Sequence, residues 1–169
     1  QLVSYLGRVN VSFLDKYLVT ASFRADGSSK FAKGSRWGYF PSASLAWRVS
    51  GEDFFTKAKF LSFVDDLKIR TSYGVTGNFQ IGNYDHLSLM ALDNYILGTG
   101  NGQLVQGYKP NTIKNDDLSW EKNAMVNVGV DLQMFKGLLG ITVDYYNTNT
   151  SNMLLNVPVP HLTGYSTAL

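Results

Sequence analysis

Cysteine is missing from the sequence, proline occurs only 4 times, and neither sign of charge dominates. The absence of cysteine excludes a disulfide framework and thiolate chemistry. Lysine and arginine number 15 against 13 aspartates and glutamates, which gives a net charge of +2. A nucleic-acid-binding protein normally carries a basic face, and this sequence shows none, so no nucleic-acid partner is expected.

Long apolar runs are missing as well. No stretch approaches the roughly 20 residues that a helix needs to cross a bilayer, and no signal-peptide pattern is present. These absences exclude a helical membrane protein. They do not exclude a membrane β-barrel, because barrel strands alternate apolar and polar side chains and leave the average hydropathy near neutral.

Alternation of period two runs through much of the chain and predicts β-strands. In 5–14, for example, Val9 and Val11 share one face while Arg8 and Asn10 share the other. The other predicted strands repeat this alternation, with Ser, Thr, Asn, Gly or Arg on the polar face. We therefore expect an all-β, antiparallel, up-and-down fold. The predicted strands are residues 5–14, 17–26, 38–49, 66–76, 121–135 and 138–147.

The connections between these strands divide into two kinds. Turns 15–16 and 136–137 lie at one end of a meander, together with 50–65, which has room for a short helix. The polar loop 27–37 and the long loop 77–119 lie at the other end. Short turns on one side and long loops on the other are typical of outer-membrane barrels. Strands of about ten residues also match the length that a tilted strand needs to cross the hydrocarbon.

Aromatic residues are predicted to form belts at the two edges of the bilayer, because Tyr and Trp favour the interface. Those near the short turns are Phe13, Tyr17, Trp47 and Phe135, and those near the long loops are Tyr39 and Tyr73. The alternative is a soluble β-sandwich that serves as a binding or adhesion module, in which the apolar face would be buried under a second sheet.

Six strands are too few to close a membrane barrel, because the smallest have about eight. An open edge in lipid would leave backbone N–H and C=O groups unpaired. The chain therefore needs further strands, which come either from other copies or from a longer parent chain. We favour the longer parent, in which residues 1–169 are part of a barrel domain.

Several motifs in order along the chain point to a family. They are RADGSSKF at 24–31, GYFPS at 38–42, DLKIRTSYGVTGN at 66–78, LSWEK at 118–122 and LLNVPVP at 154–160. This ordered series closely resembles the C-terminal part of the barrel in SusC/RagA-type TonB-dependent outer-membrane transporters. The resemblance covers nearly the whole chain.

The resemblance implies a barrel of about 22 strands, plugged by an N-terminal domain and embedded as a multi-pass protein in the lipid of a Gram-negative outer membrane. It implies active import of oligosaccharides or peptides, driven by the TonB complex through the N-terminal part that this sequence lacks. A SusD-like surface lipoprotein is the implied lid, and neither enzymatic activity nor a cofactor is implied. A barrel component of a larger secretion or motility assembly is the alternative.

Two groups of residues are candidate functional residues. One group is charged and shares the predicted lumen face, where it serves either as a polar path or plug-docking surface, or as ion pairs that brace the wall. It consists of Arg8, Arg24, Asp26, Arg48, Lys68, Arg70, Asp131 and Asp144. The other group lies in or near the long loop and suits contact with substrate or with a lid partner. It consists of Asn78, Tyr84, His86, Tyr95, Tyr108 and Trp120.

No catalytic or metal site is predicted. Asp116 and Asp117 offer two carboxylates, whereas calcium usually takes about 6 to 8 oxygen ligands. His86 lacks a second histidine or a cysteine at zinc-ligand spacing. A third hypothesis is a glycan-cleaving enzyme of β architecture, which would need two carboxylates about 5–10 Å apart across a cleft.

Overall fold

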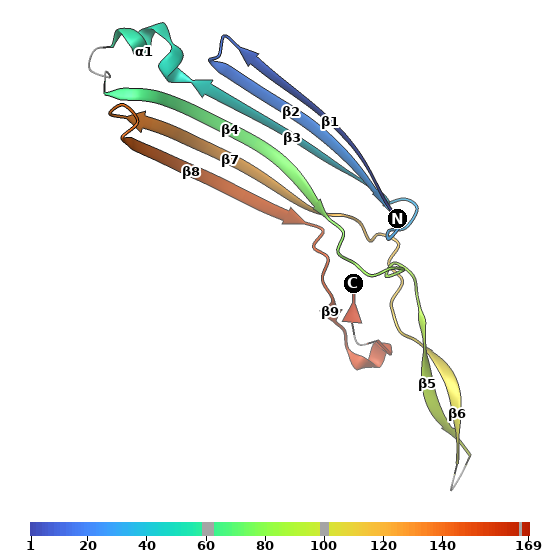
Figure 1. The fold of residues 1–169 in the computed structure, drawn as a ribbon. Helices are drawn as coiled ribbons and strands as arrows, with labels where there is room; N and C mark the ends of the chain where they lie inside the picture. The colour runs from blue at the N-terminus through green and yellow to red at the C-terminus, as the bar shows by residue number, and fades with distance from the viewer. Residues whose placement is uncertain (59–62, 99–101, 166) are drawn as a thin grey trace.

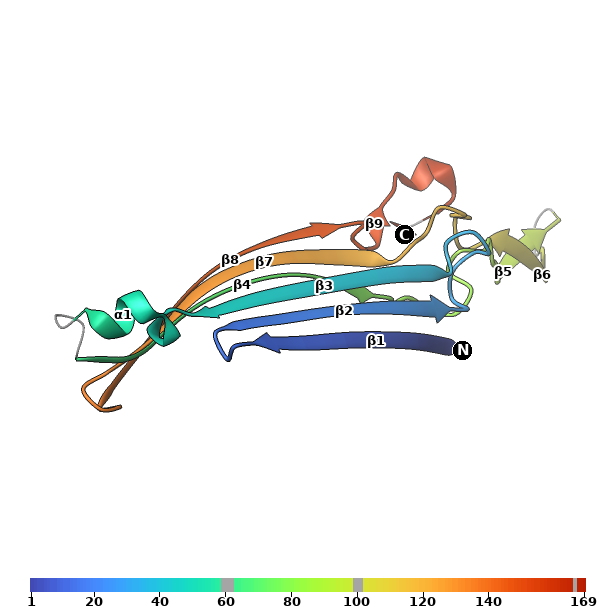
Figure 2. The same ribbon diagram turned by 90° about the horizontal axis from the view of Figure 1, so that it is seen from above.

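The computed structural model describes residues 1–58, 63–98, 102–165 and 167–169. Its main element is one antiparallel sheet of six strands in the order β1-β2-β3-β4-β7-β8, drawn as a single curved layer in Figures 1 and 2. The strands are β1 (Leu2–Phe13), β2 (Tyr17–Ser28), β3 (Trp37–Arg48), β4 (Val64–Asn78), β7 (Glu121–Met134) and β8 (Leu139–Ser151). All six predicted strands are confirmed, with ends that differ from the predicted ones by a few residues.

Short elements complete the chain at both ends of this sheet. A 3-10 turn η1 (Val49–Gly51) and helix α1 (Asp53–Lys57) lie in the connection that was predicted to hold a short helix, and residues 59–62 of that connection lie outside the described residues. After β8 come β9 (Val157–Pro158), the 3-10 turn η3 (His161–Thr163) and β10 (Thr167–Ala168). In the described part of the chain, no helix has the length and apolar character needed to cross a membrane.

One face of the sheet, here called the apolar face, carries the apolar set of every strand. Its middle row runs through the register partners Val11, Val19, Leu45, Thr71 and Val128. Val11, Val19 and Leu45 are 53%, 42% and 47% exposed. The β-sandwich alternative requires a second sheet over these side chains, and the described residues place none there.

The opposite face, here called the polar face, carries hydroxyl and amide side chains in its middle. Asn10, Thr20, Ser44, Ser72 and Asn127 are register partners one position along from the apolar row. The Thr20 hydroxyl donates to Asn10 Oδ1 at 2.9 Å. Because successive side chains of a strand point to opposite faces, the alternation in sequence becomes a two-sided wall.

Aromatic rings pair across strands at both ends of the apolar face. At the short-turn end, the ring of Tyr17 lies 6.5 Å from that of Trp47. At the long-loop end, Phe23 stacks on Tyr39 with ring centroids 6.0 Å apart. This arrangement agrees with the two predicted belts. The apolar side chains of the sheet lie between them.

The packed core lies at the long-loop end, on the polar-face side. Phe31, Phe40 and Trp120 are 0%, 3% and 2% exposed, and Ile81 and Leu118 complete the cluster. These residues come from four separate stretches of the chain, so the cluster ties the long loops to the sheet. We call it the loop-end core.

Glycine makes room for the loop-end core. A Cβ on Gly77 would lie 2.1 Å from the buried Phe40 ring. The ring therefore lies over the backbone of β4 in the space that a larger residue would fill.

The long loop contains a hairpin that the sequence did not lead us to expect. β5 (Met90–Leu97) and β6 (Gln103–Pro110) form their own two-stranded sheet. In Figures 1 and 2 this hairpin projects beyond the long-loop end of the main sheet. The sequence predicted a long loop over 77–119 without naming these two strands within it.

Candidate functional site

Ion pairs connect three strands on the polar face near the short-turn end. The guanidinium of Arg70 in β4 contacts Asp144 of β8 through Nη2 at 2.8 Å and Asp131 of β7 through Nε at 3.2 Å. Lys68 contacts the same Asp131 carboxylate at 3.3 Å. The Thr142 hydroxyl donates to the other oxygen of Asp131 at 3.1 Å. Four charged side chains of the predicted lumen group thus form one network.

Gly129 explains how Arg70 reaches a strand that is not its neighbour. Arg70 is paired with Gly129, and Gly129 is paired with Asp144. A Cβ on Gly129 would lie 2.9 Å from Arg70 Cζ and 2.5 Å from Asp144 Oδ1. The guanidinium crosses β7 over this glycine, so the network depends on a residue without a side chain.

The remaining charges of the predicted lumen group lie apart from this network. Arg48 contacts Asp66 at 3.6 Å, and Ser50 also donates a hydrogen bond to Asp66. At the long-loop end, Arg24 contacts Asp26 at 2.8 Å, and its guanidinium lies 5.3 Å from the centre of the Phe40 ring. Arg8 is paired in register with Ser22 of β2, on the same face.

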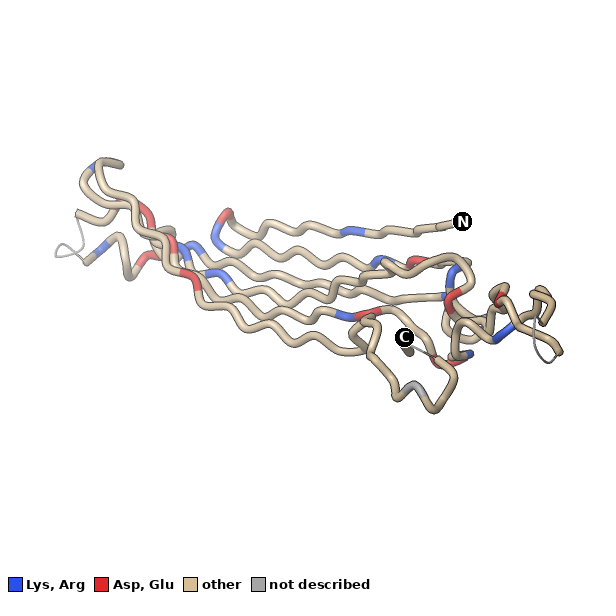
Figure 3. The backbone as a smooth tube through the Cα atoms, turned by 90° about the horizontal axis from the view of Figure 1, so that it is seen from below, with Lys and Arg blue, Asp and Glu red and all other residues tan. Residues whose placement is uncertain are grey.

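Charge is unevenly distributed along the sheet. Figure 3 shows Lys, Arg, Asp and Glu gathered toward the short-turn end and again around the long loops. Ion pairs that brace the wall account for the contacts of Arg24, Arg48, Lys68 and Arg70. Contact of these groups with a substrate or a plug stays a prediction.

At the base of the hairpin, Lys30 joins two loops. Its ammonium donates to the Ile81 carbonyl at 2.6 Å, and its own carbonyl lies 2.9 Å from His86 Nδ1. Asn78 donates to Glu121 Oε2 at 3.4 Å. Of these two predicted contact residues, His86 therefore contacts another loop, and Asn78 joins the end of β4 to its register partner in β7.

Trp120 requires a correction. It was predicted to contact substrate or partner, but it is only 2% exposed. Its indole N–H donates to the Arg36 carbonyl at 3.0 Å, and its ring packs against Phe31 and Phe40. Trp120 is a core residue of the loops, because both its ring and its polar atom are already occupied.

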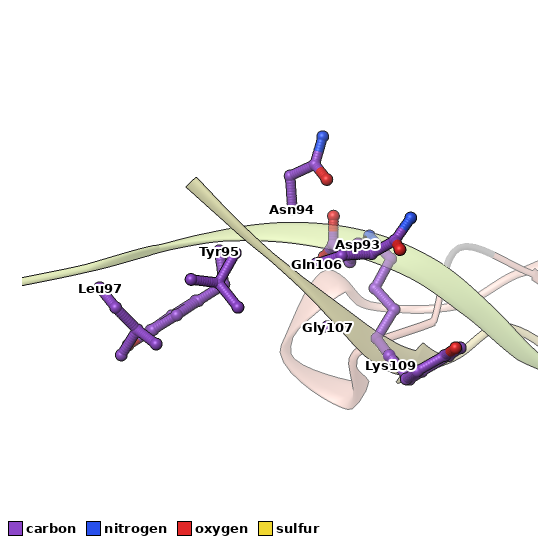
Figure 4. A pocket seen from close by; sticks show the side chains of 9 residues that line it. Asp93, Asn94, Tyr95, Leu97, Gln106, Gly107 and Lys109 are labelled. Carbon is purple, nitrogen blue, oxygen red and sulfur yellow. Dashed lines mark ion pairs between the residues drawn. The ribbon is translucent and has the colours of Figure 1, made fainter. Parts of the chain in front are cut away.

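Tyr84, Tyr95 and Tyr108 remain accessible. The two hairpin tyrosines are 64% and 71% exposed, and Tyr84 is 63% exposed. Beside Tyr95 the hairpin forms a hollow of ≈ 410 Å³. Figure 4 shows Tyr95 and Leu97 together on one side of it and Lys109 on the other. Of the predicted contact group, these tyrosines are the side chains whose surfaces are free to meet another molecule.

A single threonine closes the neck of the hairpin. Thr112 Oγ1 accepts from the Leu89 N–H at 2.9 Å and donates to the Leu87 carbonyl at 2.8 Å. The Asn111 N–H donates to the Leu89 carbonyl at 2.7 Å. The two strands are therefore held together where they leave the loop-end core.

Glu52 is a residue that the sequence reasoning missed. Its carboxylate accepts hydrogen bonds from Tyr17 at 2.8 Å and from Trp47 Nε1 at 3.2 Å, and it contacts Lys16 at 3.2 Å. The Tyr17 hydroxyl, followed by Trp47 and Lys16, lowers the pKa of Glu52 below its ordinary value. The residue ties the aromatic belt of the short-turn end to the connection between β3 and β4.

Metal chemistry finds no support in the described residues, which contain no group of three or more His, Cys, Asp or Glu placed to hold an ion. Asp116 contacts Lys114.

Comparison with known proteins covers almost the whole chain. The family model described as TonB dependent receptor-like, beta-barrel matches residues 3–168. TonB-dependent receptor P39 of Formosa agariphila is 40% identical over 98% of this chain and 15% of that protein. TonB-dependent receptor SusC of Bacteroides thetaiotaomicron is 36% identical over 98% of this chain and 16% of that protein.

Solved structures agree with these relatives. The RagAB peptide importer in its closed-closed state matches 98% of this chain and 17% of the compared chain, with a TM-score of 0.83 at 32% identity. Its open-open state matches with a TM-score of 0.77 at 33% identity. The chain thus spans 15–17% of the length of the relatives named above. On the family model, the relatives and the six-stranded antiparallel sheet together, this chain belongs to the TonB-dependent receptor β-barrels of the SusC/RagA type.

Proposed function

We propose that residues 1–169 form part of the wall and the extracellular loops of an active importer in the outer membrane of a Gram-negative bacterium. The observation that carries the proposal is the two-sided sheet, with an uncovered apolar face and a polar face, in a chain matched from residue 3 to residue 168 by a barrel family. A strand that meets lipid on one side and a lumen on the other needs this division.

The apolar face is the lipid-facing surface in this proposal. Fully burying a valine or leucine side chain away from water is worth about 1.5–3 kcal/mol. Val9, Val11 and Val143 remain 62%, 53% and 63% exposed. A wall with this many uncovered apolar side chains is stable in hydrocarbon and unstable in water. The long loops then lie on the cell exterior, and the short turns lie on the periplasmic side.

Energy and a lid come from outside this chain. We infer that the TonB complex acts through a plug in the N-terminal part of the parent, and that a SusD-like surface lipoprotein covers the long-loop end. The matched RagAB structures are those of a peptide importer in a closed-closed and an open-open state. Transport of an oligosaccharide or peptide through the parent, without catalysis or a cofactor, is the proposed activity.

The exposed tyrosines of the loops are the proposed first contacts for substrate or lid. Tyr84, Tyr95 and Tyr108 offer aromatic surface together with a hydroxyl, a combination that suits both sugars and peptides.

Uptake by intact cells tests this function. A strain without the parent gene and a complemented strain are supplied with fluorescently labelled oligosaccharides and peptides, with and without a protonophore. We expect uptake of one substrate class to require the parent and the proton gradient. Normal uptake without the parent, combined with loss of an exported protein from the medium, would instead assign the barrel to a secretion assembly.

A further inference from the structure

The β5–β6 hairpin is an arm that lacks a partner within the described residues. Each strand has 8 residues, so the arm reaches about 26 Å at about 3.3 Å per residue. It is hydrogen-bonded as a separate two-stranded sheet. An isolated two-stranded hairpin is marginally stable in water, and packing against another surface is what normally stabilises it.

The two faces of the arm differ in charge. One face, here called the uncharged face, consists of the register pairs Met90–Pro110, Leu92–Tyr108, Asn94–Gln106 and Ile96–Leu104. The other face, here called the charged face, contains Asp93 and Lys109, which form an ion pair at 3.1 Å, together with Tyr95. Charges mark the side of a surface that stays in water, since interface centres are depleted of them.

The uncharged face is also strongly exposed. Leu92, Ile96, Leu104 and Tyr108 are between 58% and 71% exposed. Tyrosine and methionine are enriched in protein interfaces, and aspartate and lysine are depleted. The two faces are similarly exposed, since Tyr95 on the charged face is 64% exposed, so the composition of the uncharged face is what points to it as the side that meets a protein.

We propose that the uncharged face of the β5–β6 arm is the docking surface for the surface lipoprotein that covers the barrel. This inference rests on the proposed function, because it takes the lid from there. What is new is the surface that holds the lid, namely the uncharged face of the β5–β6 arm. Leu92 and Tyr108, which face each other across the two strands, are the central contacts.

Lipid is excluded as the occupant by the position of the arm. The aromatic pair Phe23–Tyr39 marks the membrane edge at the long-loop end, and Figures 1 and 2 show the arm continuing past that end, away from the strands. The uncharged face therefore lies outside the hydrocarbon.

A second copy of the arm offers too little surface. Two strands about 26 Å long and about 10 Å wide present about 260 Å², whereas a stable interface needs about 800 Å² from each partner. The arm is adequate only as part of a larger contact. A lid that rests on the long-loop end as well as on the arm provides such a contact.

Matched substitutions on the two faces test the proposal in the full-length parent. Leu92→Asp and Tyr108→Asp place a charge on the uncharged face. Leu97→Asp places the same charge on the charged face, at an exposed fraction of 54% against 58% for Leu92. Each variant is purified from outer membranes in mild detergent. The readout is the amount of the N-terminally lipidated protein that copurifies with the wild-type parent, identified by mass spectrometry and measured per mole of parent.

We expect Leu92→Asp and Tyr108→Asp each to lower the copurified lipoprotein about tenfold or more, and Leu97→Asp to change it less than twofold. Equal loss in all three variants, or no loss in any, overturns the proposal. Loss of folded parent from the membrane in the Leu92→Asp strain also overturns it, because the arm would then be covered by the parent itself. If no lipoprotein copurifies with the wild-type parent, the lid named in the proposed function is wrong, and the docking proposal is overturned with it. Import by the parent is tested separately by the uptake experiment.

Discussion

On the apolar face of the sheet, Val11, Val19 and Leu45 point toward surroundings that the described chain does not supply, whereas on the polar face Arg70, Asp131 and their neighbours satisfy one another. The same strands build both faces. The stability of the apolar face depends on the solvent around it. The stability of the polar face depends on specific ion pairs and on glycines that let the paired side chains meet. A substitution should therefore be judged by the face on which it falls.

The largest effect is expected where the polar-face side is packed. Trp120→Ala removes a ring that is 2% exposed and leaves the Arg36 carbonyl without its donor. Truncating a buried aromatic residue costs about 3–5 kcal/mol. We expect hydrogen exchange of the loops around the loop-end core to accelerate accordingly. Tyr95→Ala, at an exposed aromatic residue, should change the free energy of unfolding by no more than about 0.5 kcal/mol. Equal effects of the two substitutions would contradict the assignment of Trp120 to a packed core.

The second effect separates the two faces at neighbouring positions. Val128→Arg places a charge in the middle row of the apolar face, where lipid makes it cost about 2–4 kcal/mol. Asn127→Arg places the same side chain on the polar face and should cost much less. Folding of the parent into lipid vesicles, followed by urea titration, measures both. A larger penalty for Asn127→Arg would reverse the assignment of the faces.

A smaller effect concerns the glycine that Arg70 crosses. Gly129→Ala places a methyl group 2.5 Å from Asp144 Oδ1, so the Arg70–Asp144 contact must shift. Both groups are about one third exposed, so the expected loss is about 1 kcal/mol by the same titration. Gly140→Ala on the same face is the control, because nothing lies within 4 Å of its Cβ position. Equal losses in the two variants would show that replacing glycine in a strand, and not the lost contact, sets the cost.

The smallest effect depends on pH. The pKa of Glu52 is lowered in the folded state, so the stabilisation that its carboxylate provides is present above the ordinary glutamate pKa of about 4.3 and is lost as pH falls through the lowered value. We expect Glu52→Gln to flatten the acid limb of a stability-against-pH curve below about pH 4. An unchanged curve would mean that the contacts with Tyr17 and Trp47 are not coupled to folding.

The sheet could be predicted from the sequence because each strand reports its two faces locally. Alternating residues such as Val9 and Arg8 are neighbours in the chain, so the pattern can be read without knowing the fold. The tight turns and the long loops then fix the up-and-down order. Motif resemblance identified the family, and the comparisons confirm it.

The loop region could not be predicted in the same way. In β5, Tyr95, Ile96 and Leu97 are apolar in succession, so the strict alternation of apolar and polar residues that predicted the other strands is lost along this segment. The loop-end core is assembled from residues as far apart as Phe31 and Trp120. Nothing local shows whether an aromatic residue in a loop packs or is exposed, which is why Trp120 was assigned to contact.

The role of Glu52 was hidden for a similar reason. Its three partners, Lys16, Tyr17 and Trp47, lie on other segments of the sequence, and they meet only when β2 and β3 are paired.

The division into a lipid-facing and an inward face can be measured directly along β7. The chain contains no cysteine, so single cysteines at consecutive positions from 124 to 132 of the parent can carry nitroxide labels without competition from this segment. In vesicles, collision with oxygen reports lipid and collision with a water-soluble nickel chelate reports water. We expect positions 124, 126, 128, 130 and 132 to favour oxygen and the positions between them not to. Accessibility without a period of two, or with the opposite phase, would contradict the membrane wall.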